Sequence, residues 1–292
     1  MDVIFVKPRH QYDSYYDLWE LVKCSHFPVI YPDQIPEFDA ANHGRNYMYI
    51  VAPFNGEMYQ DAVKNRRHPL LLWNLERPGE DTIENYRISS EKHIADGYID
   101  DVIVSDLSLA LKTRFHFVPV GLHEDYIMAK DEELINLSKP YAFSHLMCYS
   151  NRRGFLFKEP SHELRLYNNL KVAPRGWDDV RDDSLRASCC MLYLHQDFHY
   201  IVAPLRFVLA MSYGLPIISE FCERPTPYNS YIMHTFTDRQ TMDDLLQRYA
   251  NARYYNSIVG HIIQARTNYL KQYKFDDVLK RFASRYVGRN VH

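Results

Sequence analysis

The stretch Ala203–Glu220, with the sequence Ala-Pro-Leu-Arg-Phe-Val-Leu-Ala-Met-Ser-Tyr-Gly-Leu-Pro-Ile-Ile-Ser-Glu, is the most informative part of the chain for the fold. Its apolar residues follow helical spacing over Leu205–Tyr213, and Gly214 is a normal helix stop. The following run, Leu215–Ser219, is apolar enough for a strand that is buried on both faces. The stretch therefore predicts a loop, an amphipathic helix and a buried strand.

This pattern resembles the donor-site helix of GT-B glycosyltransferases, in which a loop and a helix end in Gly-Leu-Pro before a β-branched strand. The resemblance implies that the amino end of the helix faces the diphosphate of a nucleoside-diphosphate sugar. A helix start suits this role because its free N–H groups and positive dipole end attract anions. In open α/β sheets, ligands also bind beyond the carboxyl ends of the strands, where this loop lies.

The segment departs from one family pattern and is similar to another. In the glycosyltransferase group 1 donor-site pattern, two glutamates are spaced E-x7-E, but the matching positions here hold Ile201 and Leu209. Leu205-Arg206 is similar instead to the phage DNA β-glucosyltransferase pattern, in which the arginine binds the diphosphate. The resemblance implies that Arg206 is a phosphate ligand, and a guanidinium fork suits a diphosphate. The alternative is a surface or capping arginine.

Two more groups are expected at the donor site. The turn at 149–154, Tyr-Ser-Asn-Arg-Arg-Gly, follows a predicted strand and contains Arg152 and Arg153 beside a glycine. GT-B enzymes resemble this arrangement, with basic residues that reach toward the phosphates, although a solvated turn is the alternative. His195 ends a predicted strand just before the donor loop, which suits a contact with the donor sugar or phosphate.

Strand-like and helix-like runs alternate along the whole chain. The first half has strand-like runs at 3–6, 47–52, 70–75, 102–104 and 115–120, separated by helix-like runs at 11–23, 57–67, 84–96 and 107–112. Such alternation predicts a parallel sheet covered by helices. After a polar, acidic stretch at 123–138 the alternation restarts, with strand-like runs at 141–149, 191–194 and 215–219.

The alternation therefore predicts an α/β fold class, and the resemblance at 203–220 implies the GT-B type, with two Rossmann-like domains whose parallel sheets face each other across a cleft. We expect an N-terminal acceptor-side domain at 1–125 and a nucleotide-sugar-binding domain at 139–270. The last segment, 271–292, is expected to be a helix that crosses back to the N-terminal domain.

Composition restricts the binding partners and the cellular location that are expected. The net charge of −3 does not indicate a polyanion-binding surface, although a local basic groove can hide in a balanced total. Lys64-Asn-Arg-Arg-His68 could contact phosphates, with a solvated helix end as the alternative. The five cysteines have no metal-binding spacing and fit a reduced, cytoplasmic setting. No apolar run is long enough for a membrane span.

Transfer to a hydroxyl with inversion needs a general base, and a carboxylate also suits an oxocarbenium-like centre. Glu76 is the best candidate because it follows the buried strand-like run at 70–75, at the predicted mouth of the cleft. Arg77 and Asp106 are further acceptor-side candidates, and Asp101 is a weaker alternative base. A salt bridge between Glu76 and Arg77 in a loop is the competing interpretation.

No metal or other cofactor is expected. The acidic cluster at 178–183 falls within a polar, helix-like stretch and is interpreted as a solvated face, and arginines with a helix dipole can balance a departing diphosphate.

The sequence thus predicts a glycosyltransferase (hexosyl- or pentosyltransferase), metal-independent and with a preference for inversion. The donor is expected to be a nucleotide sugar, with a UDP-sugar assumed from common family usage. DNA, a glycan, a protein and a small molecule remain open as acceptors. A non-catalytic nucleotide-sugar- or carbohydrate-binding protein and a GT-B sugar-nucleotide epimerase are the alternatives.

Overall fold

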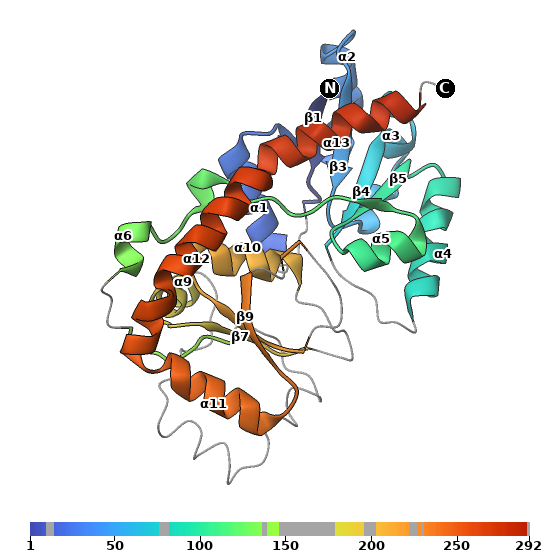
Figure 1. Ribbon diagram of the computed structural model, residues 1–292. Helices are drawn as coiled ribbons and strands as arrows, with labels where there is room; N and C mark the ends of the chain where they lie inside the picture. Colours follow the sequence, from blue (N-terminus) through green and yellow to red (C-terminus); the bar gives the residue numbers. More distant parts are fainter. Residues whose placement is uncertain are drawn as a thin grey trace. The chain divides into compact units, whose positions relative to one another are not determined.

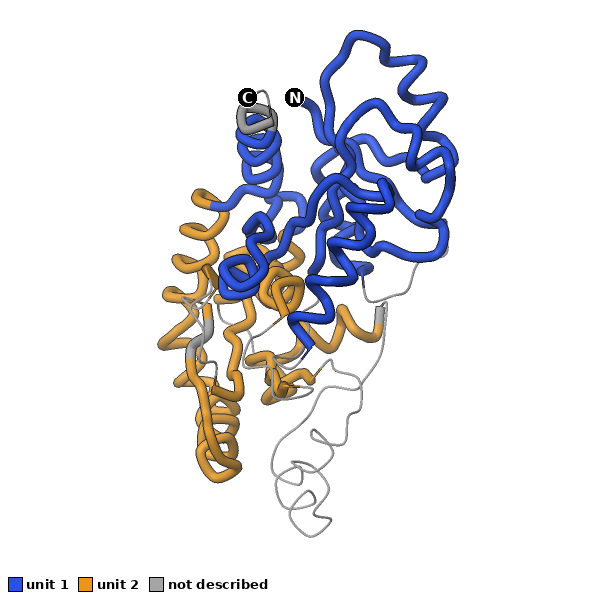
Figure 2. The backbone as a smooth tube through the Cα atoms, turned by 90° about the vertical axis from the view of Figure 1, so that its right-hand side faces the viewer, with its two compact units in different colours: residues 1–126, 273–292 blue, residues 127–272 orange. Residues whose placement is uncertain are grey.

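The computed structural model describes residues 1–9, 15–75, 82–135, 139–145, 179–195, 203–221, 227–228 and 231–290. The chain forms two compact units (Figure 2). Unit 1 consists of Met1–Tyr126 and Tyr273–His292, and unit 2 consists of Ile127–Gln272.

Unit 1 is built on a parallel sheet. In its described part the strands are β1 (Asp2–Val6), β2 (Val29–Ile30), β3 (Tyr47–Val51), β4 (Leu70–Asn74), β5 (Asp101–Val104) and β6 (His116–Phe117), in the spatial order β2-β1-β3-β4-β5-β6. Every neighbouring pair is parallel, and the register aligns Ile4 with Tyr49 and Leu71 with Asp101. The central strands β3 and β4 are almost wholly buried, as continuous apolar runs require.

Helices cover this sheet (Figure 1). They are α1 (Tyr16–Ser25), α2 (Ile35–Ala41), α3 (Asp61–Lys64), α4 (Ile83–Ala95), α5 (Leu107–Thr113) and α13 (Phe275–Asn290), with short 3-10 turns η2 (Pro32–Gln34), η3 (Gly56–Met58) and η5 (Glu124–Tyr126). The apolar side chains of α4 and α5 join those of the strands in one core cluster, in which Ile83, Leu109 and Val104 are all buried. Burial of this face stabilises both the helices and the sheet.

The C-terminal segment belongs to unit 1. Leu122 N–H donates to the carbonyl of Tyr273 at 2.9 Å, and Phe275 N–H donates to the carbonyl of Leu122 at 3.0 Å. The Phe275 ring then stacks on Phe5 and Trp73, with ring centroids 6.4 and 6.1 Å apart. These contacts hold α13 against β1 and α1.

Unit 2 has a second parallel sheet in its described part. Strands β7 (Met191–Tyr193), β8 (Ile217–Glu220) and β9 (Ile232–Phe236) lie in the order β7-β8-β9. The described helices are α6 (Asp131–Leu134), α9 (Asp179–Arg186), α10 (Pro204–Ser212), α11 (Arg239–Tyr249) and α12 (Ala252–Gln272). The buried Arg266 of α12 donates to the carbonyl of Ala129 at 2.8 Å and forms an ion pair with Asp131.

Some local predictions were wrong. The helix expected at 57–67 is replaced by η3, the one-turn α3 and a loop, because Arg66 folds back onto the carbonyl of Val63 and the carboxylate of Asp100. The strand expected at 115–120 is only β6, since Pro119 has no N–H to donate to a ladder. Strands β2 and β9 and helix α2 were not predicted.

Candidate donor site

The candidate site in unit 2 lies where strands β7 and β8 end and α10 begins. Strands β7 and β8 are parallel and α10 connects them, so the amino end of α10 lies at the carboxyl edge of this sheet. The Tyr193 hydroxyl accepts a hydrogen bond from Ala203 N–H at 3.1 Å, which ties the end of β7 to the start of the helix. The carboxyl ends of β7 and β8 and the start of α10 therefore lie at the same edge of the sheet.

The amino end of α10 is suited to an anion. Its N-cap residue is Ala203, which offers no side-chain cap, and the next residue is Pro204. Within α10, every residue of which is described, the first turn contains no acidic side chain. The partial positive charge of the helix end is therefore not neutralised by the helix itself.

Arg206 lies in the first turn of α10. Its side chain is half-buried, and its Nη1 atom is inaccessible to solvent yet has no hydrogen-bond partner among the described residues. Leaving a buried donor unsatisfied costs about 1–3 kcal/mol, and more for a charged group. A ligand with anionic oxygens would satisfy this donor and match its charge.

His195 follows β7 and is almost fully buried, with 1% of its surface exposed. Its backbone N–H donates to Oε2 of Glu220 at 3.1 Å, and its Nε2 lies 3.1 Å from the carbonyl oxygen of Phe221. Because a carbonyl only accepts, Nε2 carries the proton in this arrangement. The imidazole orientation is thus set by the chain at the end of β8.

Two residues of this site were not singled out from the sequence. Tyr193 and Glu220 are the last residues of β7 and β8, and both bond to residues of the loop edge, Ala203 and His195. The available signal was their position at the carboxyl ends of predicted neighbouring strands, which parallel sheets bring to one edge.

The remaining predicted site residues fall into two groups. Glu76, Arg77, Arg152 and Arg153 lie outside the described residues, whereas 179–183 of the acidic stretch lie in α9, as the helix-like pattern predicted. Asp106 is described and directly follows β5 in unit 1. Its Oδ1 accepts from Ser108 N–H at 2.8 Å and from Leu109 N–H at 3.3 Å, so this carboxylate caps α5.

Asp101 does not suit the role of base. It is the first residue of β5, at the amino edge of the sheet, and its Oδ2 lies 2.8 Å from Nε2 of His116. An α/β sheet usually binds its substrate at the carboxyl ends of its strands. Asp101 lies at the opposite edge, because it stands at the start of β5.

Within the described residues, no group of three or more histidine, cysteine, aspartate or glutamate side chains could hold a metal ion. None of the helices described is both long and apolar enough to cross a membrane.

Comparisons with known proteins identify the class of fold. No family model and no curated protein matches this sequence. HepE of Anabaena in complex with UDP matches in structure with a TM-score of 0.60 at 10% identity, over 99% of this chain and 100% of that chain. The β-glucosyltransferase of phage T4 matches with a TM-score of 0.53 at 10% identity, over 97% and 99% of the two chains.

A third solved structure, an α-glucosyltransferase with UDP and a 13-mer DNA, has a TM-score of 0.53 at 8% identity, over 99% of this chain and 98% of that one. At these identities the likeness establishes the fold. The protein has the GT-B fold of these glycosyltransferases, as residues 203–220 predicted, and the expected resemblance to the phage enzyme is confirmed at the level of fold.

Proposed function

We propose that this protein is a glycosyltransferase that binds a nucleoside-diphosphate sugar at the amino end of α10. The observation that carries the proposal is the buried, unpartnered Nη1 of Arg206 beside a helix start without a cap. Both features attract the same ligand group, an anionic diphosphate. Solved structures of the same fold hold UDP, and one of them holds UDP and glucose, which favours a UDP-sugar as the donor.

In this proposal the residues of unit 2 bind the donor and stabilise the leaving group. As the bond between the anomeric carbon and the diphosphate oxygen breaks, negative charge grows on the departing nucleoside diphosphate. Arg206 and the positive end of the α10 dipole neutralise that charge without a metal ion. His195, whose imidazole is held by Phe221, borders the same edge and orients the donor.

The acceptor hydroxyl forms the new bond to the anomeric carbon and gives its proton to a general base. We assign this role to Glu76, which follows β4 in the sequence, and we expect inversion at the anomeric carbon. Arg152 and Arg153 are assigned to the donor phosphates, and Arg77 and Asp106 to the acceptor side. The acceptor class is open among DNA, a glycan, a protein and a small molecule.

Calorimetric titration with UDP and UDP-glucose tests the donor site. Arg206→Ala is expected to weaken UDP binding by about 10- to 100-fold, because a charge-assisted hydrogen bond contributes roughly 1.5–3 kcal/mol. Arg206→Lys should restore only part of the affinity, since one ammonium group does not replace the guanidinium fork. Arg253→Ala is the matched control, because Arg253 is an exposed arginine of α12 whose side chain has no hydrogen bond or ion pair within the described part of the chain.

Release of UDP from UDP-glucose, measured with a panel of the four acceptor classes, tests catalysis. Turnover with at least one acceptor is expected. Tight donor binding without turnover for any of a broad set of nucleotide sugars would favour a non-catalytic nucleotide-sugar-binding protein. Unchanged UDP affinity in a folded Arg206→Ala variant would remove α10 from the site.

A further inference from the structure

Unit 1 contains a hollow that the proposed reaction does not use. It has a volume of about 720 Å³ and is lined by Asn46, Tyr47, Lys64, Arg66, Arg67, His68, Pro69, Gly97, Asp100 and Tyr286, together with Met1. Asn46, Pro69 and Asp100 immediately precede strands β3, β4 and β5. The hollow therefore lies at the amino edge of this parallel sheet, whereas Asp106 and the segment after β4 follow the carboxyl ends. Its volume is within the range of small-molecule sites.

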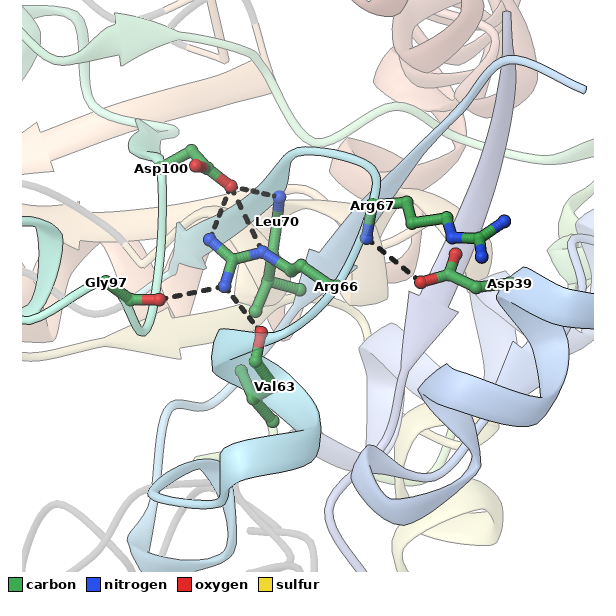
Figure 3. A network of polar contacts seen from close by, with 7 residues as sticks. All are labelled: Asp39, Val63, Arg66, Arg67, Leu70, Gly97 and Asp100. Atoms are coloured by element: carbon green, nitrogen blue, oxygen red, sulfur yellow. Dashed lines mark hydrogen bonds and ion pairs between the residues drawn. The ribbon is translucent and has the colours of Figure 1, made fainter.

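Two carboxylates hold the loop that forms one wall of the hollow (Figure 3). Asp39 is buried and accepts the backbone N–H of Arg67 at 3.0 Å, as well as the hydroxyl of Tyr47 at 2.6 Å. Asp100 accepts the backbone N–H of Leu70 at 2.7 Å. The loop is thus anchored on both sides of His68, and its side chains project from a rigid frame.

The two adjacent arginines of this loop have different roles. The Arg66 side chain is 5% exposed and donates to the carbonyls of Val63 and Gly97 and to the carboxylate of Asp100, so its donors hold the loop together. The Arg67 side chain points away from this cluster in Figure 3. Arg67 is exposed, and its guanidinium has no hydrogen bond or ion pair within the described residues. A rigid loop therefore presents one arginine whose guanidinium is not bound by any described side chain.

Further donors lie around Arg67. The ammonium group of Lys64 is 4.2 Å from the centre of the Tyr98 ring, and the His68 ring is 3.8 Å from that of Tyr47. Burial is the main cause that lowers the pKa of His68, so at neutral pH its imidazole is an uncharged N–H donor. The carboxylate of Asp100 is already paired with Arg66. The hollow therefore has a positive balance in a chain whose net charge is −3.

We propose that this hollow is a second ligand site, separate from the donor site, that binds a small molecule carrying a phosphate or diphosphate group, with Arg67 as its principal anion contact and Lys64 and His68 beside it. The guanidinium fork matches phosphate oxygens in geometry, and the anchored loop limits the entropy lost on binding. A concave site of this volume suits a compact phosphorylated ligand better than an extended nucleic-acid backbone. The inference does not depend on the proposed transferase activity.

The test uses inorganic pyrophosphate as the probe in calorimetric titrations of the full chain. All variants carry Arg206→Ala, so that pyrophosphate binding at the proposed donor site is weakened, and this background stays valid if Arg206 binds nothing. Adding Arg67→Ala is expected to lower the pyrophosphate affinity at least 10-fold, and Arg67→Glu should abolish binding. Adding Arg253→Ala should leave it unchanged. The backbone bond from residue 67 to Asp39 survives these changes, and circular dichroism verifies the fold.

Three results would overturn the proposal. They are the absence of pyrophosphate binding in the Arg206→Ala background, equal affinity with and without Arg67, and equal loss in the Arg253→Ala control. A parallel titration with a single-stranded and a duplex oligonucleotide separates the possible sources of the phosphate. If oligonucleotides bind through Arg67 with a steep salt dependence while pyrophosphate does not, the hollow is part of a nucleic-acid surface and the small-ligand assignment is wrong.

Discussion

The close approach of Gly121 to the C-terminal segment gives a stability prediction that can be worked from distances. A methyl group added at Gly121 would lie 2.5 Å from Cα of Phe275 and 2.7 Å from the carbonyl oxygen of Tyr273. Comfortable contact between carbon atoms needs about 3.5–4.0 Å, so the two backbones must separate by roughly 1 Å. Both of these neighbours are backbone atoms, which no side-chain rotation can move.

That separation acts on bonds that attach α13 to unit 1. The hydrogen bonds of Leu122 with Tyr273 and Phe275, at 2.9 and 3.0 Å, would stretch or break, at about 0.5–1.5 kcal/mol each. The fully buried Phe275 ring would also shift against Phe5 and Trp73, and overpacking of this kind costs about 1–3 kcal/mol. We therefore expect Gly121→Ala to lower the free energy of unfolding by about 2–6 kcal/mol.

Urea unfolding followed by tryptophan fluorescence measures this effect, because Trp73 contacts Phe275 directly. The urea midpoint should fall by roughly 1 M or more. Gly56→Ala is the matched control within unit 1, since a Cβ there meets nothing within 4 Å. A Gly121→Ala midpoint equal to that of this control would refute the docking of the C-terminal segment on Leu122.

Two further predictions concern the reaction. Glu76→Gln should lower the single-turnover transfer rate by about 100- to 10,000-fold, because glutamine cannot accept the acceptor's proton. The UDP affinity should stay within a few-fold of the wild-type value. A near-normal rate would show that Glu76 is not the base and would favour a loop ion pair between Glu76 and Arg77. Transfer activity should persist in excess EDTA, since Arg206 and the start of α10 are proposed to balance the negative charge of the leaving diphosphate. A complete loss of activity that manganese or magnesium restores would show a metal requirement, with the acidic stretch at 178–183 as the first candidate for the metal ligands.

The sequence was most predictive where a single local pattern determines the element. Helix α10 and strand β8 were predicted to within two residues, because the apolar spacing and the stop at Gly214, which has a φ of 62°, are local features. Strands β1, β3, β4 and β5 were equally clear as continuous apolar runs. From these elements the parallel α/β class followed, and the resemblance of 203–220 to a donor-site helix implied the GT-B fold.

Prediction was weaker where the outcome depends on distant partners. The segment 57–67 has a helical pattern, but it is mostly not helical, because Arg66 is bonded to Gly97 and Asp100 from another part of the chain. Strand β2 has only two residues, and its place at the sheet edge comes from pairing with β1. No periodicity can be read from so short a run.

The same division holds for the sites. The sequence by itself determined that Arg206 stands in the first turn of a helix that is followed by a buried strand. It could do so because the apolar spacing and the glycine stop are patterns of residues close together in the chain. Only the tertiary structure decided that its Nη1 is buried without a partner, that Glu220 holds His195, and that Arg66 is committed to the loop while Arg67 is not. The physical reason is that burial and pairing are set by residues far away in the chain, which the local pattern does not contain.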